Sequence, residues 1–284
     1  MAHEVARHAA EIAQERAERD ARLRDPMGWL SLVGLHWLVP GRQRFGAHPS
    51  NEIVLRSAGG AMPPVAGVFD VVDGAVHVHP TADSRLSVAG QPVPDGLALV
   101  DDVAGEPTLL ELASLRMYLI RRGHDRLALR VKDIEAPAIT AFGGMPWYSV
   151  DPSWRVTARL IPAPAGATIP VPDIVGNVVD EPTPGDLEFE RDGATHRLRA
   201  LEGQRGNVTL VFGDATNGEE TYGAGRFLDS GPVQADNSVE LDFNRAYNPP
   251  CVFSPYATCP LPPDGNRLPI RVTAGELLWR PAET

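Results

Sequence analysis

The sequence has little lysine and no long apolar run. Lys132 is the only lysine among 284 residues, so a Schiff-base mechanism would have to use this residue alone. A P-loop needs a lysine within a glycine-rich motif, and the sequence has no such motif. No stretch approaches the roughly 18 apolar residues of a membrane-spanning helix. These absences exclude P-loop nucleotide binding and predict a protein without a membrane partner.

The chain also has few cysteines, and its acidic residues outnumber its basic ones. The formal net charge of −11 argues against nucleic-acid binding, because neutralising phosphates requires a basic face. The two cysteines predict free thiols rather than a disulfide framework. Residues 1–24 carry charges of both signs and lack the apolar segment of a signal peptide, so we expect a cytoplasmic protein.

The patterns that are present predict a mainly β protein with an N-terminal helix. Residues 2–24 are rich in Ala, Glu and Arg, with opposite charges four residues apart, which is typical of a solvated helix. Short strands follow, with Asp-Gly turns at 73–74 and 192–193 and a further hairpin at 122–125. A last strand is expected over 268–273. The absence of βαβ alternation argues against a doubly wound sheet.

These patterns divide the chain into four parts. We expect the helix and an apolar anchor over 1–40, and a β-sandwich-like domain over 41–135. A connector should span 136–153, and a second β domain should span 154–284. The number of strands expected in the last part suits an antiparallel β-barrel or a sandwich.

Several order-specific motifs occur after residue 147. They are FGDATNG at 212–218, TYGAGRFL at 221–228, the stretch from DFN at 242–244 to Asn266, and AGE at 274–276. Through these motifs the chain resembles the bacterial and archaeal family named domain of unknown function 1684. The resemblance covers most of the chain and is strongest in its second half. The family has no established activity, so the resemblance implies no catalytic residue.

The first half of the chain has a second, shorter resemblance. RFGAHPSNEIVL at 44–55 and LSVAGQPV at 86–93 are similar to parts of a forkhead-associated domain, a β-sandwich that reads phosphothreonine. Where such domains carry a phosphate-binding arginine, this chain has Ala47, and PPVAG at 63–67 replaces their serine, arginine and histidine. The resemblance therefore implies only a fold, and phosphopeptide binding is not expected.

Arg226 is the first candidate for ligand binding, because it lies in a strand pattern between a glycine and a phenylalanine. An inward-facing arginine must be paired. A carboxylate of Asp214, Asp242 or Glu276 is the natural partner. Two interpretations stay open: Arg226 clamps an anionic ligand, or it forms a buried structural ion pair.

Asp242 and Asn244 are two residues apart, so both should lie on the same face of a strand. They could orient a polar ligand group or a cation. Alternatively, Asn244 and Asn248 could tie the proline turn at 249–250 through local hydrogen bonds. Tyr222 and Tyr247 are expected to form walls of the same site.

Cys251 and Cys259 are weaker candidates, for a catalytic role. His196 is the only histidine after residue 124, so it is the one base that could activate a thiol in this part of the chain. A structural zinc site would need further ligands, and no cofactor fingerprint occurs, so we expect neither metal nor cofactor. The alternative interpretation is that both thiols are buried and inert.

The leading functional hypothesis is binding of a small polar or anionic molecule in the C-terminal β domain. Arg226 and Asp214 would supply the charged pair. Asp242 and Asn244 would orient the ligand, and Tyr222 and Tyr247 would form the walls. Two hypotheses from other classes stay open: a hydrolase or thiol-dependent enzyme that uses the same pocket, and a protein-interaction module in the N-terminal sandwich. The sequence has no Gly-x-Ser-x-Gly elbow and no His-Glu-x-x-His helix, so it leaves open whether the protein is an enzyme.

Overall fold

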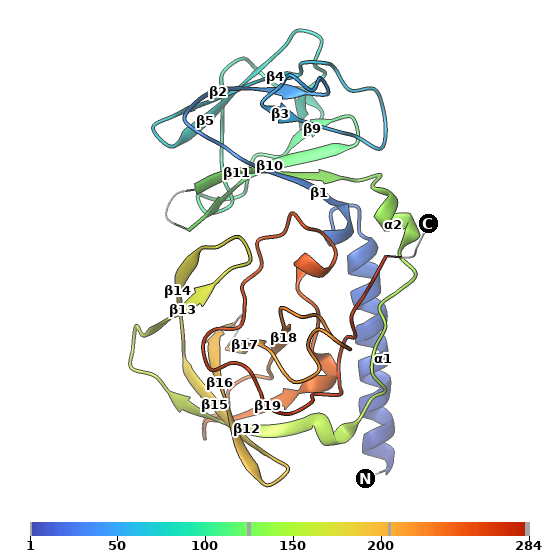
Figure 1. Cartoon of the computed structure of the whole chain (residues 1–284), viewed down its shortest axis with the longest axis vertical. Helices are drawn as coiled ribbons and strands as arrows, with labels where there is room; N and C mark the ends of the chain where they lie inside the picture. Colours follow the sequence, from blue (N-terminus) through green and yellow to red (C-terminus); the bar gives the residue numbers. More distant parts are fainter. Residues whose placement is uncertain (1, 124–125, 204–205, 282–284) are drawn as a thin grey trace. The chain divides into compact units, whose positions relative to one another are not determined.

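The fold is mainly β, with an N-terminal helix, several antiparallel sheets and a curled half-barrel in the C-terminal part (Figure 1). The predicted fold class is therefore confirmed. The chain forms two units: an N-terminal unit, Arg22–Phe142, and a C-terminal unit made of Met1–Ala21 together with Gly143–Thr284. The computed structural model describes three stretches of the chain, residues 2–123, 126–203 and 206–281.

The predicted N-terminal helix, α1, spans Ala2–Arg24 and belongs to the C-terminal unit for most of its length. It runs along one side of that unit (Figure 1). His8 and Ile12 on its inner face are 4% and 1% exposed, and the half-buried Arg16 and Arg19 continue this face at helical spacing. The face that α1 buries is therefore more polar than apolar.

Two β-sheets make up the N-terminal unit. The first has, in spatial order, β1 (Leu32–Trp37), β11 (Arg126–Asp133), β10 (Leu115–Arg122), β9 (Leu110–Leu112), β6 (Ser87–Val88) and β7 (Gln91–Pro92). The second has β3 (Ile53–Val54), β2 (Gly41–Gly46), β4 (Gly67–Val72), β5 (Ala75–Pro80) and β8 (Leu97–Leu99). A short 3-10 turn and a short helix lie at the two ends of the unit: η1 (Trp29–Ser31) and α2 (Pro137–Ala141).

The predicted hairpins of this unit are present. Asp73 and Gly74 have φ values of 50° and 76° and join β4 to β5, as a tight Asp-Gly turn requires. β10 and β11 pair antiparallel up to Arg122 and Arg126. The tip of this second hairpin, residues 124–125, lies outside the described residues.

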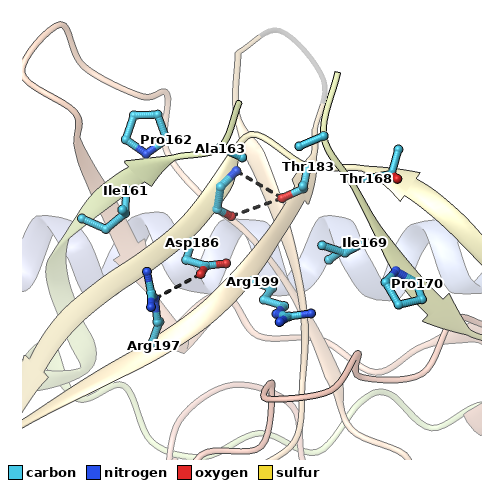
Figure 2. Close-up of a pocket in the computed structure, with 12 residues that line it drawn as sticks. Ile161, Pro162, Ala163, Thr168, Ile169, Pro170, Thr183, Asp186, Arg197 and Arg199 are labelled. Atoms are coloured by element: carbon cyan, nitrogen blue, oxygen red, sulfur yellow. Dashed lines mark hydrogen bonds and ion pairs between the residues drawn. The ribbon is translucent and has the colours of Figure 1, made fainter. Parts of the chain in front are cut away.

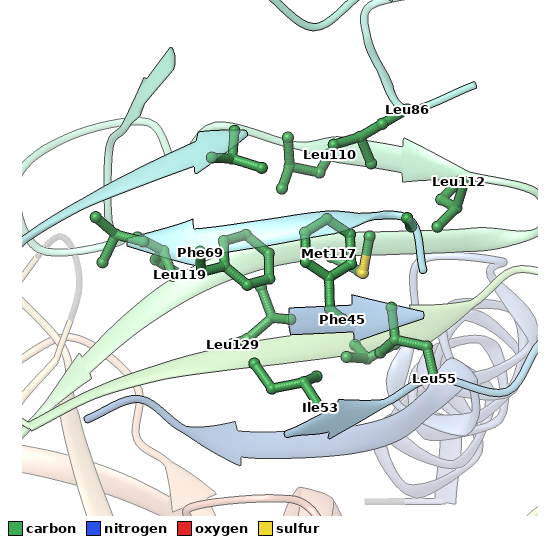
Figure 3. Close-up of a cluster of buried hydrophobic side chains, with 14 of the residues drawn as sticks. Phe45, Ile53, Leu55, Phe69, Leu86, Leu110, Leu112, Met117, Leu119 and Leu129 are labelled. Atoms are coloured by element: carbon green, nitrogen blue, oxygen red, sulfur yellow. The ribbon is translucent and has the colours of Figure 1, made fainter. Parts of the chain in front are cut away.

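The core of the N-terminal unit lies between its two sheets. Phe45 and Phe69 of the second sheet stack with their ring centroids 4.3 Å apart. Met117, Leu119 and Leu129 of the first sheet belong to the same cluster (Figure 3). Apolar residues at alternate strand positions place all five side chains on the inner faces. The two sheets thus enclose one core, as in a sandwich.

One curled sheet dominates the C-terminal unit. Its strands, in spatial order, are β18 (Arg226–Asp229), β17 (Val208–Phe212), β16 (Ala194–Glu202), β15 (Gly185–Arg191), β12 (Arg155–Pro162) and β19 (Ser238–Asp242). Phe227 of β18 also exchanges backbone hydrogen bonds of 2.8 and 2.9 Å with Tyr247, which follows β19. This pairing brings the two ends of the sheet together and produces the half-barrel. A separate ribbon consists of β13 (Thr168–Pro172) and β14 (Val178–Pro182).

After β19 the chain forms turns and loops, so the strand predicted over 268–273 was wrong. The stretch makes isolated backbone hydrogen bonds with the turn after β17, from the Leu268 N–H to the Gly213 carbonyl at 2.8 Å and from the Ala215 N–H to the Ile270 carbonyl at 3.0 Å. Further along, its backbone bonds to side chains. The Val272 N–H donates to the Asp214 carboxylate at 3.2 Å, and its carbonyl accepts from Arg226 at 2.9 Å. Side chains thus satisfy backbone groups that a sheet would otherwise pair. The 3-10 turns around β12 and β19 are η2 (Pro152–Trp154), η3 (Phe243–Arg245) and η4 (Pro250–Val252).

Candidate functional site

Arg226, the predicted charge partner, opens β18 and is completely buried. Its Nη2 donates to Asp214 Oδ2 at 2.8 Å and to the Val272 carbonyl at 2.9 Å. Its Nη1 donates to the carbonyls of Ala274 and Glu276. Asp214 is therefore the partner among the three carboxylates that the sequence offered. Because protein atoms occupy both terminal nitrogens, this geometry favours the structural ion pair over a ligand clamp.

Asp214 is held by the turn that follows β17. Its Oδ1 accepts hydrogen bonds from the backbone N–H and the hydroxyl of Thr216, at 2.8 and 2.6 Å. Gly225 has a φ of 98°, and a Cβ at this position would lie 2.5 Å from the carbonyl oxygen of Phe212, so the close approach requires glycine. The motif residues of this region thus form a network around the buried arginine, whose Nε is buried without a hydrogen-bond partner among the described residues.

Asp242 and Asn244 do not share a strand face, contrary to the prediction. Asp242 ends β19, and its Oδ1 accepts from the backbone N–H of Asn244 at 3.1 Å and from its Nδ2 at 2.8 Å. These bonds turn the chain into η3. Asn244 also exchanges two hydrogen bonds of 2.9 Å with the backbone of Asp151. Asn244 therefore ties the connection before β12 rather than the proline turn at 249–250.

A group of buried and half-buried polar side chains lies along α1, and we call it the helix cluster. Its members are His8, Arg16, Arg19, Asp242, Asn248 and Glu276. His8 Nε2 and Asp242 Oδ2 are 2.6 Å apart, and Arg19 Nε donates to Glu276 Oε1 at 3.0 Å. The backbone N–H of Asn248 donates to the second oxygen of Glu276. Sequence reasoning missed the cluster because the helix residues resembled part of a solvated face.

Several polar atoms of the helix cluster are buried without a hydrogen-bond partner among the described residues. They are Nε and Nη2 of Arg16, Nδ1 of His8 and Oδ1 of Asn248. Burial lowers the pKa of Arg16, against the opposite effect of the Asp242 and Glu276 charges. Buried water molecules would satisfy such atoms. The helix cluster is therefore a polar interface between α1 and the rest of the C-terminal unit.

Glu276 makes stability depend on pH. Burial raises the pKa of its carboxyl above the ordinary 4.5, although Arg19 and the Asn248 N–H act in the opposite direction. The folded state therefore holds this proton more tightly than the unfolded chain does. Its contribution to stability is present below pH 4.5 and is lost as the pH rises through the raised pKa.

We expect this loss to appear in a comparison of wild type with Glu276→Gln, which has no proton to release. The free energy of unfolding of wild type, minus that of the variant, should fall as the pH rises above 4.5. Urea unfolding at a series of pH values measures this difference. Glu202→Gln changes an exposed carboxylate of the same unit and is the control. An equal fall with Glu202→Gln would contradict the assignment to Glu276.

Cys251 and Cys259 lie next to each other, in contact with Tyr222. The backbone N–H of Cys251 donates to the Cys259 sulfur at 3.1 Å. Hydrogen bonds with the Cys259 thiol and with the Tyr222 hydroxyl lower the pKa of Cys251 to about 7, against the effect of burial. Cys251 is half-buried, whereas Cys259 is 3% exposed. Tyr222 therefore contacts the thiols, whereas the sequence predicted it to form a wall of the ligand site.

His196, the predicted base, lies elsewhere in the unit. It is 6% exposed and packs against its cross-strand neighbour Phe189, with ring centroids 5.4 Å apart. Within the described part of the chain, no hydrogen bond joins it to either cysteine, and its Nε2 is buried without a partner. The structure thus does not bring the expected thiol and imidazole together.

Tyr247 lines a cavity of about 790 Å³ next to β18, together with Phe227 and Glu202. Its hydroxyl donates to Asp229 Oδ2 at 3.0 Å, and burial together with Asp229 raises the pKa of Tyr247. The guanidinium of Arg19 lies over the ring, 5.1 Å from its centroid. The two carboxylates make this cavity unfavourable for an anion.

A smaller pocket of about 360 Å³ is lined by the curled sheet and the β13–β14 ribbon, and we call it the arginine pocket. Arg197 and Arg199 of β16 line it, because they alternate with residues that face the core. Arg197 Nε lies 3.1 Å from Asp186 Oδ2. Figure 2 shows the Arg199 guanidinium directed toward Pro170, and no described residue forms an ion pair with it.

Asn266 fixes the backbone that carries Arg199. Its Oδ1 accepts from the Arg199 N–H at 2.7 Å, and its Nδ2 donates to the Arg199 carbonyl and to the Val211 carbonyl, both at 2.9 Å. Asn266 is completely buried. Sequence reasoning used Asn266 only as a motif residue and did not single out Arg199. The available signal was the pair of arginines at alternate positions, 197 and 199, in the hairpin expected around the Asp-Gly turn at 192–193.

The fold and the buried network define a β-rich protein built on a curled half-barrel. Residues 140–277 match the family described as a protein of unknown function, DUF1684, and the chain belongs to this family. The resemblance inferred from the sequence motifs is thereby confirmed. The solution NMR structure of an uncharacterised protein of Haloarcula marismortui is 30% identical, with 48% of this chain and 77% of that chain covered and a TM-score of 0.41. The curated proteins include no match.

The forkhead-associated resemblance of the first half is not confirmed by these comparisons and stays a prediction. Within the described ranges, no helix has the length and apolar character needed to cross a membrane. The same residues contain no group of three or more His, Cys, Asp or Glu side chains placed to hold a metal ion.

Proposed function

We propose that the C-terminal unit binds a small anion in the arginine pocket. The observation that carries this proposal is the Arg199 guanidinium, which lines a pocket without an acidic partner among the described residues. Arg197 beside it is already paired with Asp186. A guanidinium presents a planar set of donors that matches a carboxylate or a phosphate. The ligand class expected from the sequence is thus kept, and its charge partner moves from Arg226 to Arg199.

The pocket has the size and the rigidity that such a ligand needs. Its volume of about 360 Å³ lies near the lower end of the range of small-molecule sites. The two hydrogen bonds between Asn266 and the Arg199 backbone hold that backbone in place before any ligand arrives. A site organised in advance loses less conformational entropy on binding. A small organic acid or inorganic phosphate therefore suits the pocket better than a large ligand.

The residues that the sequence suggested for ligand binding have other contacts. Arg226 and Asp214 form an ion pair with each other, and Asp242 with Asn244 ends β19. These contacts support a structural role for the four residues, in which they hold the sheet that carries the pocket.

Arg199→Met tests the proposal, with citrate and inorganic phosphate as probes. We expect the variant to bind the better probe at least tenfold more weakly than wild type, about 1.4 kcal/mol, because the guanidinium supplies the charge-assisted hydrogen bonds. Arg159→Met is the matched control, since it removes an exposed arginine of β12 that does not line the pocket. Isothermal titration calorimetry at constant ionic strength measures the affinities.

Two outcomes would contradict the proposal. One is the absence of binding of either probe to wild type at millimolar concentration. The other is an equal loss of affinity in Arg159→Met and Arg199→Met, which would indicate a general effect of net charge. Thermal unfolding of both variants, compared with wild type, checks that the fold is retained.

A thiol-dependent function is the second candidate, because Cys251 accepts a hydrogen bond from Tyr222 and lies against Cys259. His196 does not support it, since this residue packs in the core of the sheet. The hydrolase and the protein-interaction hypotheses stay predictions.

A further inference from the structure

Cys251 and Cys259 form a dithiol in which one thiol is accessible and the other is enclosed. They are the only cysteines of the chain. Cys251 is half-buried and Cys259 is 3% exposed, and the Cys251 N–H points at the Cys259 sulfur, 3.1 Å away. We infer that this pair is a redox modification site, which a small-molecule disulfide converts into an intramolecular disulfide. Cys251 is the attacking thiol and Cys259 is the resolving thiol.

The backbone around each cysteine keeps the two thiols together. Cys251 lies in η4, where the Ser254 N–H donates to the Pro250 carbonyl at 3.2 Å. Cys259 is attached to the β13–β14 ribbon, because its carbonyl accepts from the Ile174 N–H at 3.0 Å. Two reacting groups held in contact have a high effective concentration. Formation of the Cys251–Cys259 disulfide should therefore be faster than attack on Cys251 by a thiol from solution.

Tyr222 supports the attacking role of Cys251. Its hydroxyl hydrogen-bonds to the Cys251 sulfur, and the Cys259 thiol does the same. Both bonds favour the thiolate, which is the nucleophile in thiol–disulfide exchange. Redox-sensitive cysteines commonly combine an accessible thiolate with an adjacent resolving cysteine, and this pair has both features.

The chemistry uses oxidised glutathione as co-reactant and proceeds in two exchange steps. The Cys251 thiolate attacks one sulfur of glutathione disulfide, forms a mixed disulfide and releases one glutathione thiolate. Cys259 then loses its proton and attacks the Cys251 sulfur, which forms the Cys251–Cys259 bond and releases the second glutathione. The dithiol is oxidised by two electrons, and glutathione disulfide is reduced to two thiols. Excess reduced glutathione reverses both steps.

Mass spectrometry of the full-length protein tests the inference. The protein is incubated with oxidised glutathione, blocked with N-ethylmaleimide and digested with trypsin. Residues 246–267 form a single tryptic peptide that holds both cysteines, because no lysine or arginine interrupts it. We expect this peptide to lose two hydrogen atoms in mass, to carry no maleimide and to recover both thiols after reduction.

Three variants separate the roles of the residues. Cys259→Ser should stop at the mixed disulfide and keep glutathione on Cys251. Cys251→Ser should react at least about tenfold more slowly, since Cys259 is enclosed. Tyr222→Phe should move the pH midpoint of Cys251 alkylation upward from about 7. A Tyr222→Phe profile identical to that of wild type would contradict the role of the hydroxyl.

Two results would overturn the inference as a whole. One is a wild-type protein that keeps both thiols under conditions in which oxidised glutathione fully oxidises dithiothreitol. The other is a stable glutathione adduct, or a linked pair of tryptic peptides from two molecules, in place of the internal disulfide. Circular dichroism of each variant confirms that its fold is intact before its reactivity is compared.

Discussion

Arg226→Met should lower the free energy of unfolding by about 3–5 kcal/mol, the largest effect that we expect of a single substitution. The change removes the cation opposite Asp214, whose carboxylate is completely buried. It also removes the donor to the carbonyls of Val272 and Ala274. A buried charge and buried carbonyls without partners are both unfavourable. Because domains are stable by roughly 5–15 kcal/mol, much of the C-terminal unit's stability would be lost.

Urea unfolding followed by circular dichroism measures this effect. Arg159→Met is the matched control, because it replaces an exposed strand arginine of the same unit by the same residue, and we expect little change. In the double variant with Asp214→Asn the losses should be less than additive, since both substitutions remove one interaction. A loss in Arg226→Met no larger than in the control would show that the ion pair does not hold the unit together.

Asp242→Ala should destabilise the protein by about 3 kcal/mol, because Asp242 serves two segments at once. Its Oδ2 lies 2.6 Å from His8 on α1, and its Oδ1 accepts both hydrogen bonds of Asn244 in η3. Removal of the carboxylate leaves His8 and Asn244 buried without these partners. The packing of α1 against the unit and the turn from β19 into η3 should both be destabilised.

Hydrogen exchange distinguishes this local effect from a general one. We expect amides around His8 to exchange faster in Asp242→Ala, in addition to the loss of stability in urea. Asp180→Ala is the control, since it removes an exposed carboxylate on β14. A double-mutant cycle with His8→Ala should give a coupling energy of about 1–3 kcal/mol. Zero coupling would show that the short His8–Asp242 contact contributes nothing to stability.

The family motifs gain a physical meaning from these contacts. Arg226 and Asn266 are buried and bond mainly to backbone groups of distant segments, and the buried Asp214 bonds to Arg226, to Thr216 and to the Val272 N–H. They hold the long C-terminal stretch, which has little regular structure, against the curled sheet. Asn266 in addition fixes the backbone of Arg199. The motif residues therefore organise the scaffold, and the proposed ligand group lies next to them rather than among them.

The candidate site was only partly predictable. The Arg226–Asp214 pair was among the partners suggested by the sequence, because a strand arginine next to apolar residues needs a buried carboxylate. The position of Asn244 was not predicted, since the strand ends at Asp242, whose side chain bonds the Asn244 N–H, and does not continue to Asn244. The contact between Tyr222 and Cys251 joins residues 29 positions apart in loops, which no periodicity reveals.

The amino-acid pattern alone was enough to predict the local elements: the helix α1, the Asp-Gly hairpins and the mainly β character. These follow from helical charge pairs, from period-two alternation and from turn residues that accept positive φ, all of which act between neighbours in the chain. Which polar side chains meet could be seen only once the chain was folded. The free energy of a buried charge depends on partners that the fold supplies, so Arg226 became structural while Arg199 was left to face a pocket.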